Sequence, residues 1–233
     1  MMMTKILSHL KTMLLLLSFT FTSCIQQDTY SKITHNFGER FKKYWYSNEA
    51  EISSYELKQT RYGEMRDGKS VLIFVTEPFS EKTFTKADNP GKDDVSVLKL
   101  NFTKRFVTGI YPYSMMTSTF FPVTDGQHCI KVSSTTQEWC GHTYMELRNK
   151  ENFDISVASY FQGENEELSI KKNLIEDDIW SMIRLLPEEL PTGNLMVIPS
   201  FFFLRLHHKP TKAYSCELSK IEQDSVSVYK IHY

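Results

Sequence analysis

The sequence lacks the local motifs that mark the common enzyme classes. It contains no glycine-rich phosphate loop, no Gly-x-Ser-x-Gly nucleophile elbow and no paired Cys-x-x-Cys motifs. No apolar run reaches the roughly 20 residues that a membrane-spanning helix needs. Basic residues are not in excess, since 27 Lys and Arg stand against 28 Asp and Glu. The chain therefore offers no electrostatic footprint for nucleic acid and no polybasic patch for anionic lipid.

The N-terminus carries the pattern of a bacterial lipoprotein signal. Lys5 and Lys11 precede the short apolar stretch Met13–Phe21, and small residues lead up to Cys24. In such signals residues 1–23 are removed and the thiol of the cysteine is acylated. Cys24 is therefore the predicted lipidation site, and the palmitoylated residue would hold the protein to a membrane.

Other interpretations of this segment remain open. Phe21 stands three residues before Cys24, where lipoprotein signals usually carry Leu, so an ordinary cleaved signal with a coincidental cysteine competes. A transmembrane anchor is a third interpretation. Ile25 follows the cysteine where an inner-membrane retention signal favours Asp, which favours the outer membrane. We expect an envelope protein tethered through the polar residues 24–36, without a cofactor.

Residues 37–233 are expected to form one α+β domain. Helical spacing of apolar residues predicts helices at 37–46 and 174–186, the second with Asn173 as its N-cap. A hairpin with its turn at Asp67-Gly68 precedes a run of alternating strands. The expected strands include residues 71–75, 96–106, 128–134, 143–149, 153–161, 196–208, 213–218 and 225–233.

Short linkers between these strands favour antiparallel neighbours, and no βαβ pattern occurs. We therefore expect a curved antiparallel sheet with one or two packed helices, similar in outline to a periplasmic lipid-carrier half-barrel. The last strand, 225–233, has no partner after it. It either pairs inward, or the chain is truncated at its C-terminus.

Two segments carry candidate functional residues. Glu138, Cys140 and His142 would project from one face of an extended strand, which is compatible with a thiolate–imidazole pair or a corner of a metal site. Because Gly141 favours a turn or bulge at this position, structural roles are the competing interpretation.

The second segment is the methionine-rich and aromatic run Tyr111–Val123. Its composition is typical of a loop packed in the protein core, and an adaptable groove for an apolar ligand is the functional alternative. The candidate ligand-binding residues are Tyr111, Tyr113, Met115, Met116 and Phe120.

The remaining reactive groups have structural interpretations. Cys129 and Cys140 are close enough in sequence to bridge across a hairpin, and buried free thiols, with Cys216, are the alternative. The adjacent histidines 207 and 208, on an expected strand, would point to opposite faces. The acidic run 176–178 would lie in the first turn of a helix, where it favours the helix dipole. No metal site is predicted.

Four segments of the chain resemble a family of uncharacterised exported bacterial lipoproteins. They are KYWYSNEAEISSYELKQTRYGEMRDG, VLKLNFTKRFVTGIYPYSMMTSTFFPV, TQEWCGHTYMELRNK and LPTGNLMVIPSFFFLRLHHKPTKAY. Members of the family often carry the label "septum formation inhibitor Maf". True Maf proteins are cytoplasmic nucleotide pyrophosphatases with a Ser-x-Ser-x-Arg signature in an α/β fold, and this chain contains neither feature, so the resemblance assigns no catalytic residue.

Two functional hypotheses follow. The first is a non-enzymatic lipoprotein that holds an apolar ligand or an envelope protein, attached to the membrane through its N-terminal lipid. The second is an enzyme, either a Maf-like nucleotide pyrophosphatase, as the family label implies, or one that uses Cys140 and His142.

Overall fold

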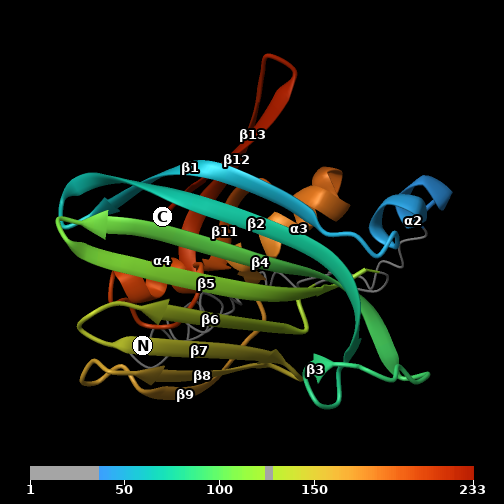
Figure 1. Ribbon diagram of the computed structural model, residues 1–233, viewed down its shortest axis with the longest axis horizontal. Coiled ribbons are helices and arrows are strands. Elements are labelled where there is room, and N and C mark those ends of the chain that lie inside the picture. The colour runs from blue at the N-terminus through green and yellow to red at the C-terminus, as the bar shows by residue number, and fades with distance from the viewer. Residues whose placement is uncertain (1–36, 124–127) are drawn as a thin grey trace, which may run out of the picture. The chain divides into compact units, whose positions relative to one another are not determined.

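A long, curved antiparallel sheet dominates the computed structural model, which describes residues 37–123 and 128–233 (Figure 1). Among these residues nine strands form this sheet, sheet A, in the order β1-β2-β4-β5-β6-β7-β8-β9, with β3 paired to β2. Its strands are β1 (Glu51–Arg61), β2 (Glu64–Ser80), β3 (Thr85–Lys86), β4 (Asp94–Thr108), β5 (Tyr111–Pro122), β6 (Lys131–Gln137), β7 (His142–Asn149), β8 (Phe153–Ser159) and β9 (Glu166–Ile170). All of them belong to one compact unit, Lys32–Tyr233. The predicted lipidation site Cys24 lies outside the described residues.

The alternation of apolar and polar residues in sheet A follows from its two different faces. On β4, Leu98, Leu100 and Phe102 are buried, while the intervening Lys99 and Asn101 are only partly covered. We call the apolar side the inner face and the opposite side the outer face. The strands predicted from this alternation at 96–106, 143–149 and 153–161 are confirmed by β4, β7 and β8.

The C-terminal part of the chain contains a smaller sheet, the α-helices α3 and α4 and a short 3-10 helix. Sheet B has the order β10-β11-β12-β13. Its strands are β10 (Leu174–Ile175), β11 (Gly193–Ile198), β12 (Tyr214–Gln223) and β13 (Val226–His232). The helices are α2 (Glu39–Trp45), α3 (Glu176–Leu185), the short 3-10 helix η1 (Pro187–Glu189) and α4 (Phe201–Leu206).

Helices α3 and α4 cover the inner face of sheet A. The ring of Phe102 meets Trp180 of α3 at 5.0 Å and Phe202 of α4 at 5.4 Å between ring centroids, both edge to face. Such pairs add to the stabilisation from burial of the rings. Both sheets and these helices share one continuous apolar core. The predicted α+β architecture, a curved antiparallel sheet with packed helices, is confirmed.

The first hairpin turn was predicted at the wrong residues. The chain reverses at Tyr62 and Gly63, both with positive φ, and Asp67-Gly68 lies inside β2. Gly68 allows β2 to approach β4 closely, because a Cβ atom there would lie 2.3 Å from the carbonyl oxygen of Arg105. A tyrosine in the left-handed region is uncommon, which is why the turn carried no recognisable signal.

The prediction for residues 173–208 was also partly wrong. Asn173 caps no helix, because Leu174–Ile175 is extended and α3 begins at Glu176. The expected strand 196–208 ends at Ile198 and gives way to α4. Ser200 caps that helix by accepting a hydrogen bond from the backbone N–H of Phe202.

Two further expectations were corrected. The pair β10 and β11 is parallel and is joined through α3, so one small β-α-β connection does occur. The run Tyr111–Val123 is not a loop, since Tyr111–Pro122 forms β5 in the middle of sheet A. The expected strand 225–233 corresponds to β13, which pairs inward with β12.

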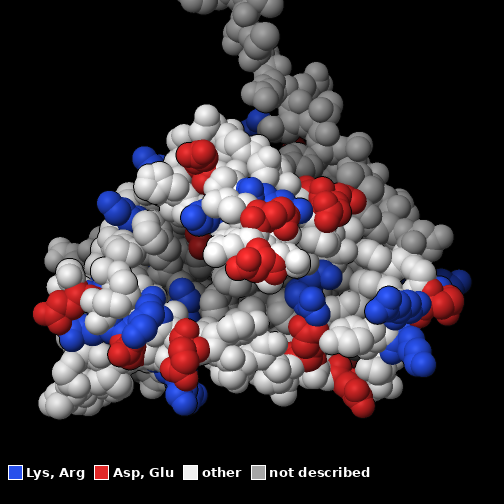
Figure 2. Space-filling model, turned by 90° about the horizontal axis from the view of Figure 1, so that it is seen from above, with Lys and Arg blue, Asp and Glu red and all other residues white. Residues whose placement is uncertain are grey.

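Charges of both signs are interspersed on the face seen in Figure 2. In Figure 2, which shows the unit from above relative to Figure 1, Lys and Arg side chains alternate with Asp and Glu side chains, and neither sign forms an extended area on this face. This pattern agrees with the near balance of 27 basic and 28 acidic residues.

Candidate functional site

The five candidate ligand-binding residues do not share one face. Tyr113 and Met115 point to the inner face and are each only 2% exposed, within the core under the helices. Met116 lies on the outer face and is exposed. Phe120 packs in a small separate apolar cluster near the far end of β5, and Tyr111 lies at the hairpin end of the strand. Because side chains of a strand alternate between faces, the run cannot form a single groove.

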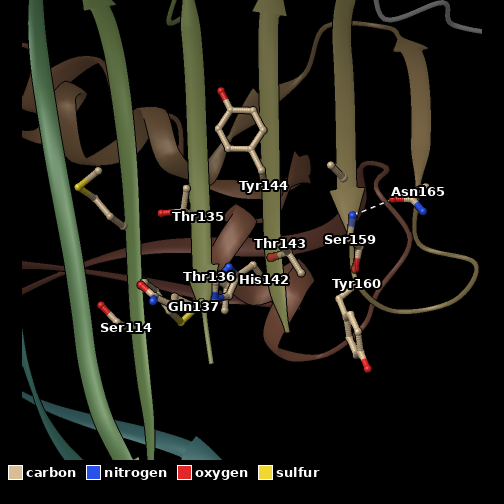
Figure 3. A pocket seen from close by; sticks show the side chains of 13 residues that line it. Ser114, Thr135, Thr136, Gln137, His142, Thr143, Tyr144, Ser159, Tyr160 and Asn165 are labelled. Carbon is tan, nitrogen blue, oxygen red and sulfur yellow. Dashed lines mark hydrogen bonds between the residues drawn. The ribbon is translucent and has the colours of Figure 1, made fainter. Parts of the chain in front are cut away.

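An open groove crosses the outer face of β5–β8 (Figure 3). This outer groove has a volume of about 640 Å³. Met116 and Tyr144 line it and are 42% and 39% exposed. The backbone N–H of Ser159 donates a hydrogen bond of 2.8 Å to Asn165 at one side of the groove. Its polar lining includes Ser114, Thr135, Gln137, His142, Ser159 and Asn165.

A charged network continues the outer face along β7. The carboxylate of Glu146 accepts hydrogen bonds from the Tyr144 hydroxyl and from Arg148 Nε, both at 2.5 Å, and Lys131 Nζ lies 3.0 Å from it. Burial acts to raise the pKa of Glu146, but the hydrogen bonds from these three groups outweigh it and hold the pKa below its usual value. Burial and the bond to Glu146 raise the pKa of Tyr144 to about 12. A second open groove of about 540 Å³ adjoins Glu146 and Arg148.

Aromatic side chains gather at the hairpin end of sheet A. The rings of Tyr111 and Trp139 lie 5.3 Å apart, and the hydroxyls of Tyr62 and Tyr113 are 3.1 Å apart. The backbone N–H of Cys140 donates a hydrogen bond of 2.5 Å to the Tyr111 hydroxyl. Burial and the contact with Cys140 raise the pKa of Tyr111 to about 12. Two separately predicted groups, the Met-aromatic run and the Glu138–His142 segment, therefore meet here.

The predicted reactive cluster does not assemble. Residues 138–141 form the turn between β6 and β7, in which the Glu138 N–H donates to the Gly141 carbonyl at 3.3 Å. Cys140 is exposed in this turn, and His142 begins β7 and lines the outer groove. Within the described residues no hydrogen bond joins the Cys140 thiol to the His142 imidazole. The turn at Gly141 agrees with the competing structural interpretation, because a Cβ there would lie 2.5 Å from the Tyr160 ring.

The three described cysteines are free thiols. Cys129 lies just before β6, where its carbonyl accepts a hydrogen bond of 3.0 Å from Asn149, and Cys140 lies in the turn after β6. The two residues are thus separated by the length of the strand and cannot form the suggested bridge. Cys129 and Cys216 are buried, and burial raises the pKa of each thiol.

A buried carboxylate that the sequence did not reveal joins α3 to α4. Asp177 accepts hydrogen bonds from the Ser200 hydroxyl at 2.8 Å and from the Phe201 N–H at 3.1 Å, at the start of α4. It is 1% exposed. Burial, followed by the neighbouring charge of Glu176, raises the pKa of Asp177 to about 7.

The neighbouring acids make similar connections. Glu176 accepts hydrogen bonds from the Ser200 N–H at 2.9 Å and from the Tyr233 hydroxyl at 2.7 Å. Asp178 accepts one from the Cys129 N–H at 3.1 Å. The sequence indicated acids at a helix N-terminus and nothing more, because their partners lie far along the chain.

An ion-pair cluster of Glu164, Arg205 and His208 lies beside the outer groove. Glu164, in the connection after β8, contacts Arg205 Nη1 at 3.0 Å and His208 Nδ1 at 2.6 Å. His208 follows α4 rather than lying on the expected strand, and its φ is 49°. Burial acts to raise the pKa of Glu164, but the hydrogen bond from His208 and the charge of Arg205 lower it overall. The group fixes the end of α4 against the β8–β9 connection.

The described residues contain no cluster of three or more His, Cys, Asp or Glu side chains that could hold a metal ion. In the same part of the chain, no helix has the length and apolarity needed to span a bilayer. Comparison of the chain with family models, with curated proteins and with solved structures finds no significant match.

Proposed function

We propose that this chain is an exported, lipid-anchored protein that binds an envelope protein, without catalysis, through the outer groove. The observation that carries the proposal is the exposure of Met116 and Tyr144 in an open groove lined by hydroxyl and amide groups. Methionine adapts its shape to a partner, and tyrosine offers apolar area together with a hydrogen-bonding group. Such a mixture is typical of protein-binding surfaces.

The form of the groove favours a protein partner over an enclosed apolar ligand. Ligand sites for apolar molecules are usually concave and bury most of the ligand. The inner face of sheet A is the apolar and concave candidate for such a site. It is already filled by Phe102, Trp180 and Phe202. The outer groove is open along β5–β8, so a segment of another protein could lie across the strands.

Anchoring would come from Cys24 and residues 24–36, which follow the lipoprotein-like signal. The acyl chains would hold the protein at the outer membrane while the tether allows the groove to reach its partner. Stable anchoring by lipid needs more than one chain or an additional contact with the membrane. The triacylated cysteine of bacterial lipoproteins meets this requirement.

The anchor is tested by labelling cells with radioactive palmitate. The full chain should incorporate the label, and Cys24→Ser should not. An unlabelled wild-type protein that fractionates with the cytosol and retains residues 1–23 contradicts the anchor.

The groove is tested separately by photo-cross-linking in cells. A photoreactive amino acid in place of Tyr144 should yield one discrete cross-linked envelope protein, and Met116→Lys should abolish that product. The same amino acid in place of Ile52, which is 65% exposed on β1 away from the groove, is the control. Equal products from both positions contradict the groove as a binding site.

A further inference from the structure

Four connections lie at one end of sheet A, and each presents a large exposed side chain. They are the turns β1–β2, β4–β5 and β6–β7 and the connection β8–β9, all on the left in Figure 1. Their exposed residues, here called the hairpin rim, are Tyr62 (69% exposed), Ile110 (83%), Trp139 (63%) and Tyr160 (71%). Single exposed apolar residues are common on protein surfaces. A large apolar or aromatic side chain at each of four neighbouring connections indicates an interaction surface.

The three aromatic side chains of the hairpin rim are supported from beneath. The Tyr62 hydroxyl contacts that of Tyr113, and the ring of Trp139 packs against Tyr111. Tyr160 lies directly against the backbone of Gly141. Because these contacts order the rings beforehand, little further conformational entropy is lost when the rim meets another surface.

Basic residues lie beside the hairpin rim. The segment that follows α4, residues 207–213, contains two histidines and two lysines and no acid. Arg61 donates a hydrogen bond to the Leu206 carbonyl, and His208 contacts Glu164 of the β8–β9 connection, so this segment lies at the same end of sheet A. Of the nearby acids, Glu164 is paired with Arg205 and Glu64 with Arg66, and Glu138 lies beside Trp139 in the β6–β7 turn.

From this combination we propose that the hairpin rim is a membrane-contact surface that docks on a bilayer with anionic headgroups. Trp and Tyr prefer the interfacial region of a bilayer, and an exposed Ile gains free energy when it leaves water. Lys209 and Lys212 would meet the anionic headgroups. Composition alone indicated no such surface, because only the fold brings this basic segment beside the exposed aromatic residues. The contact does not rest on the lipid at Cys24, and of the rim residues only Tyr160 also lines the outer groove.

The test uses the unlipidated unit, residues 32–233, which has its own core. It is mixed with vesicles of phosphatidylglycerol and phosphatidylethanolamine in equal parts, or of phosphatidylcholine alone, and floated in a density gradient. The protein should float with the anionic vesicles and release at high salt. The emission of the exposed Trp139 should shift to shorter wavelengths as it leaves water, whereas Trp45 and Trp180 already pack in the core and should change little.

The decisive variant is Ile110→Ser with Trp139→Ser. Because interfacial binding scales with the apolar area inserted, the partition coefficient should fall about tenfold or more. The matched control is Ile52→Ser, a second exposed isoleucine (65% against 83% for Ile110) at the opposite end of β1, which should bind like the wild type. Met116→Lys should also bind vesicles normally, which separates this surface from the outer groove.

Three outcomes would overturn the proposal. They are a wild-type unit that does not float with anionic vesicles, a double variant that binds as well as the wild type, and equal flotation with neutral vesicles. Loss of the cross-linked envelope protein in the double variant, without any vesicle binding by the wild type, would instead assign the rim to a protein partner. Circular dichroism of both variants would exclude unfolding as the cause of lost binding.

Discussion

Asp177 has a carboxyl group whose protonation is linked to stability. Its pKa of about 7 in the folded chain lies above the ordinary value of 3.8. The folded state therefore binds the proton more tightly than the unfolded state, and this contribution is fully present below about pH 4 and is lost as the pH rises to about 7. The difference corresponds to a decrease in the free energy of unfolding on the order of 4 kcal/mol.

This pH dependence is measurable by urea unfolding at several pH values between about 4 and 8. Asp177→Asn removes the titrating group and should flatten the part of the profile below neutral pH, even if the lost hydrogen bond from Phe201 lowers stability overall. A variant whose profile keeps the wild-type slope would contradict the assignment of this pH dependence to Asp177.

Cys140 is the exposed thiol among the three described cysteines. We expect a maleimide reagent to modify Cys140 rapidly in the folded unit, and Cys129 and Cys216 only after unfolding, since burial hinders access and raises their pKa. Peptide mass spectrometry identifies the modified residue. Rapid labelling of Cys129 would contradict its buried position.

The same residue allows the enzymatic hypothesis to be tested. Because the thiol has no hydrogen bond to His142 in the described structure, we expect nucleoside triphosphate hydrolysis by the purified chain to equal that of Cys140→Ala, at background level. Phosphate and pyrophosphate release measure it. Hydrolysis well above background that disappears in the variant would support an enzyme.

At the scale of elements, Gly68 determines how closely β2 and β4 pair. A methyl group at this position would meet the carbonyl oxygen of Arg105 at 2.3 Å and the Cβ of Phe106 at 2.8 Å. Gly68→Ala should therefore lower the free energy of unfolding by about 3 kcal/mol, the upper part of the range for overpacking. Gly91→Ala is the control, because its nearest neighbour, an oxygen of Asp94, is 3.8 Å away. Equal stability of both variants contradicts the close approach.

The start of α4 depends on Ser200. Its hydroxyl oxygen accepts a hydrogen bond from Phe202 at 3.3 Å, and its O–H donates to Asp177 at 2.8 Å. Ser200→Ala should cost about 1–2 kcal/mol in urea unfolding, because a cap and a buried hydrogen bond are lost. Ser54→Ala, at an exposed position of β1, should change little. A Ser200 variant as stable as this control would contradict a stabilising role of the Ser200 cap for α4.

The elements differ in how far the sequence predicted them. Strands such as β4 and β8 were predictable because each has one buried and one exposed face, so polarity alternates. Helix α4 was not, since five of its six side chains, Phe201, Phe202, Leu204, Arg205 and Leu206, are buried and its sequence shows no helical period. The residues before it, Pro199 and Ser200, were the available signal.

The candidate surfaces were less predictable than the elements. Tyr111 and Tyr113 were selected by composition, but their contacts with Trp139 and Tyr62 depend on strand register. Register follows from turn positions, and the turn at Tyr62 gave no signal. The outer groove could not be predicted without the strand register either, because its lining residues come from separate strands.

At the scale of the whole molecule, the continuous core predicts cooperative unfolding. Trp45 belongs to the part of the core near β2, and Trp180 packs on Phe102 from α3. In a Trp139→Phe background, the fluorescence of both tryptophans and the circular dichroism should change at one urea concentration. Two separate midpoints would show that sheet B with its helices unfolds independently of sheet A.

The cover of the inner face has a consequence for biosynthesis. All nine strands of sheet A lie before residue 171, whereas α3 and α4 begin at Glu176 and Phe201. The ribosome therefore releases the sheet first, with Phe102 and its apolar neighbours exposed until the covering helices emerge. For the exported protein that we propose, the nascent strands of sheet A would be clients for chaperones until α3 and α4 can cover them.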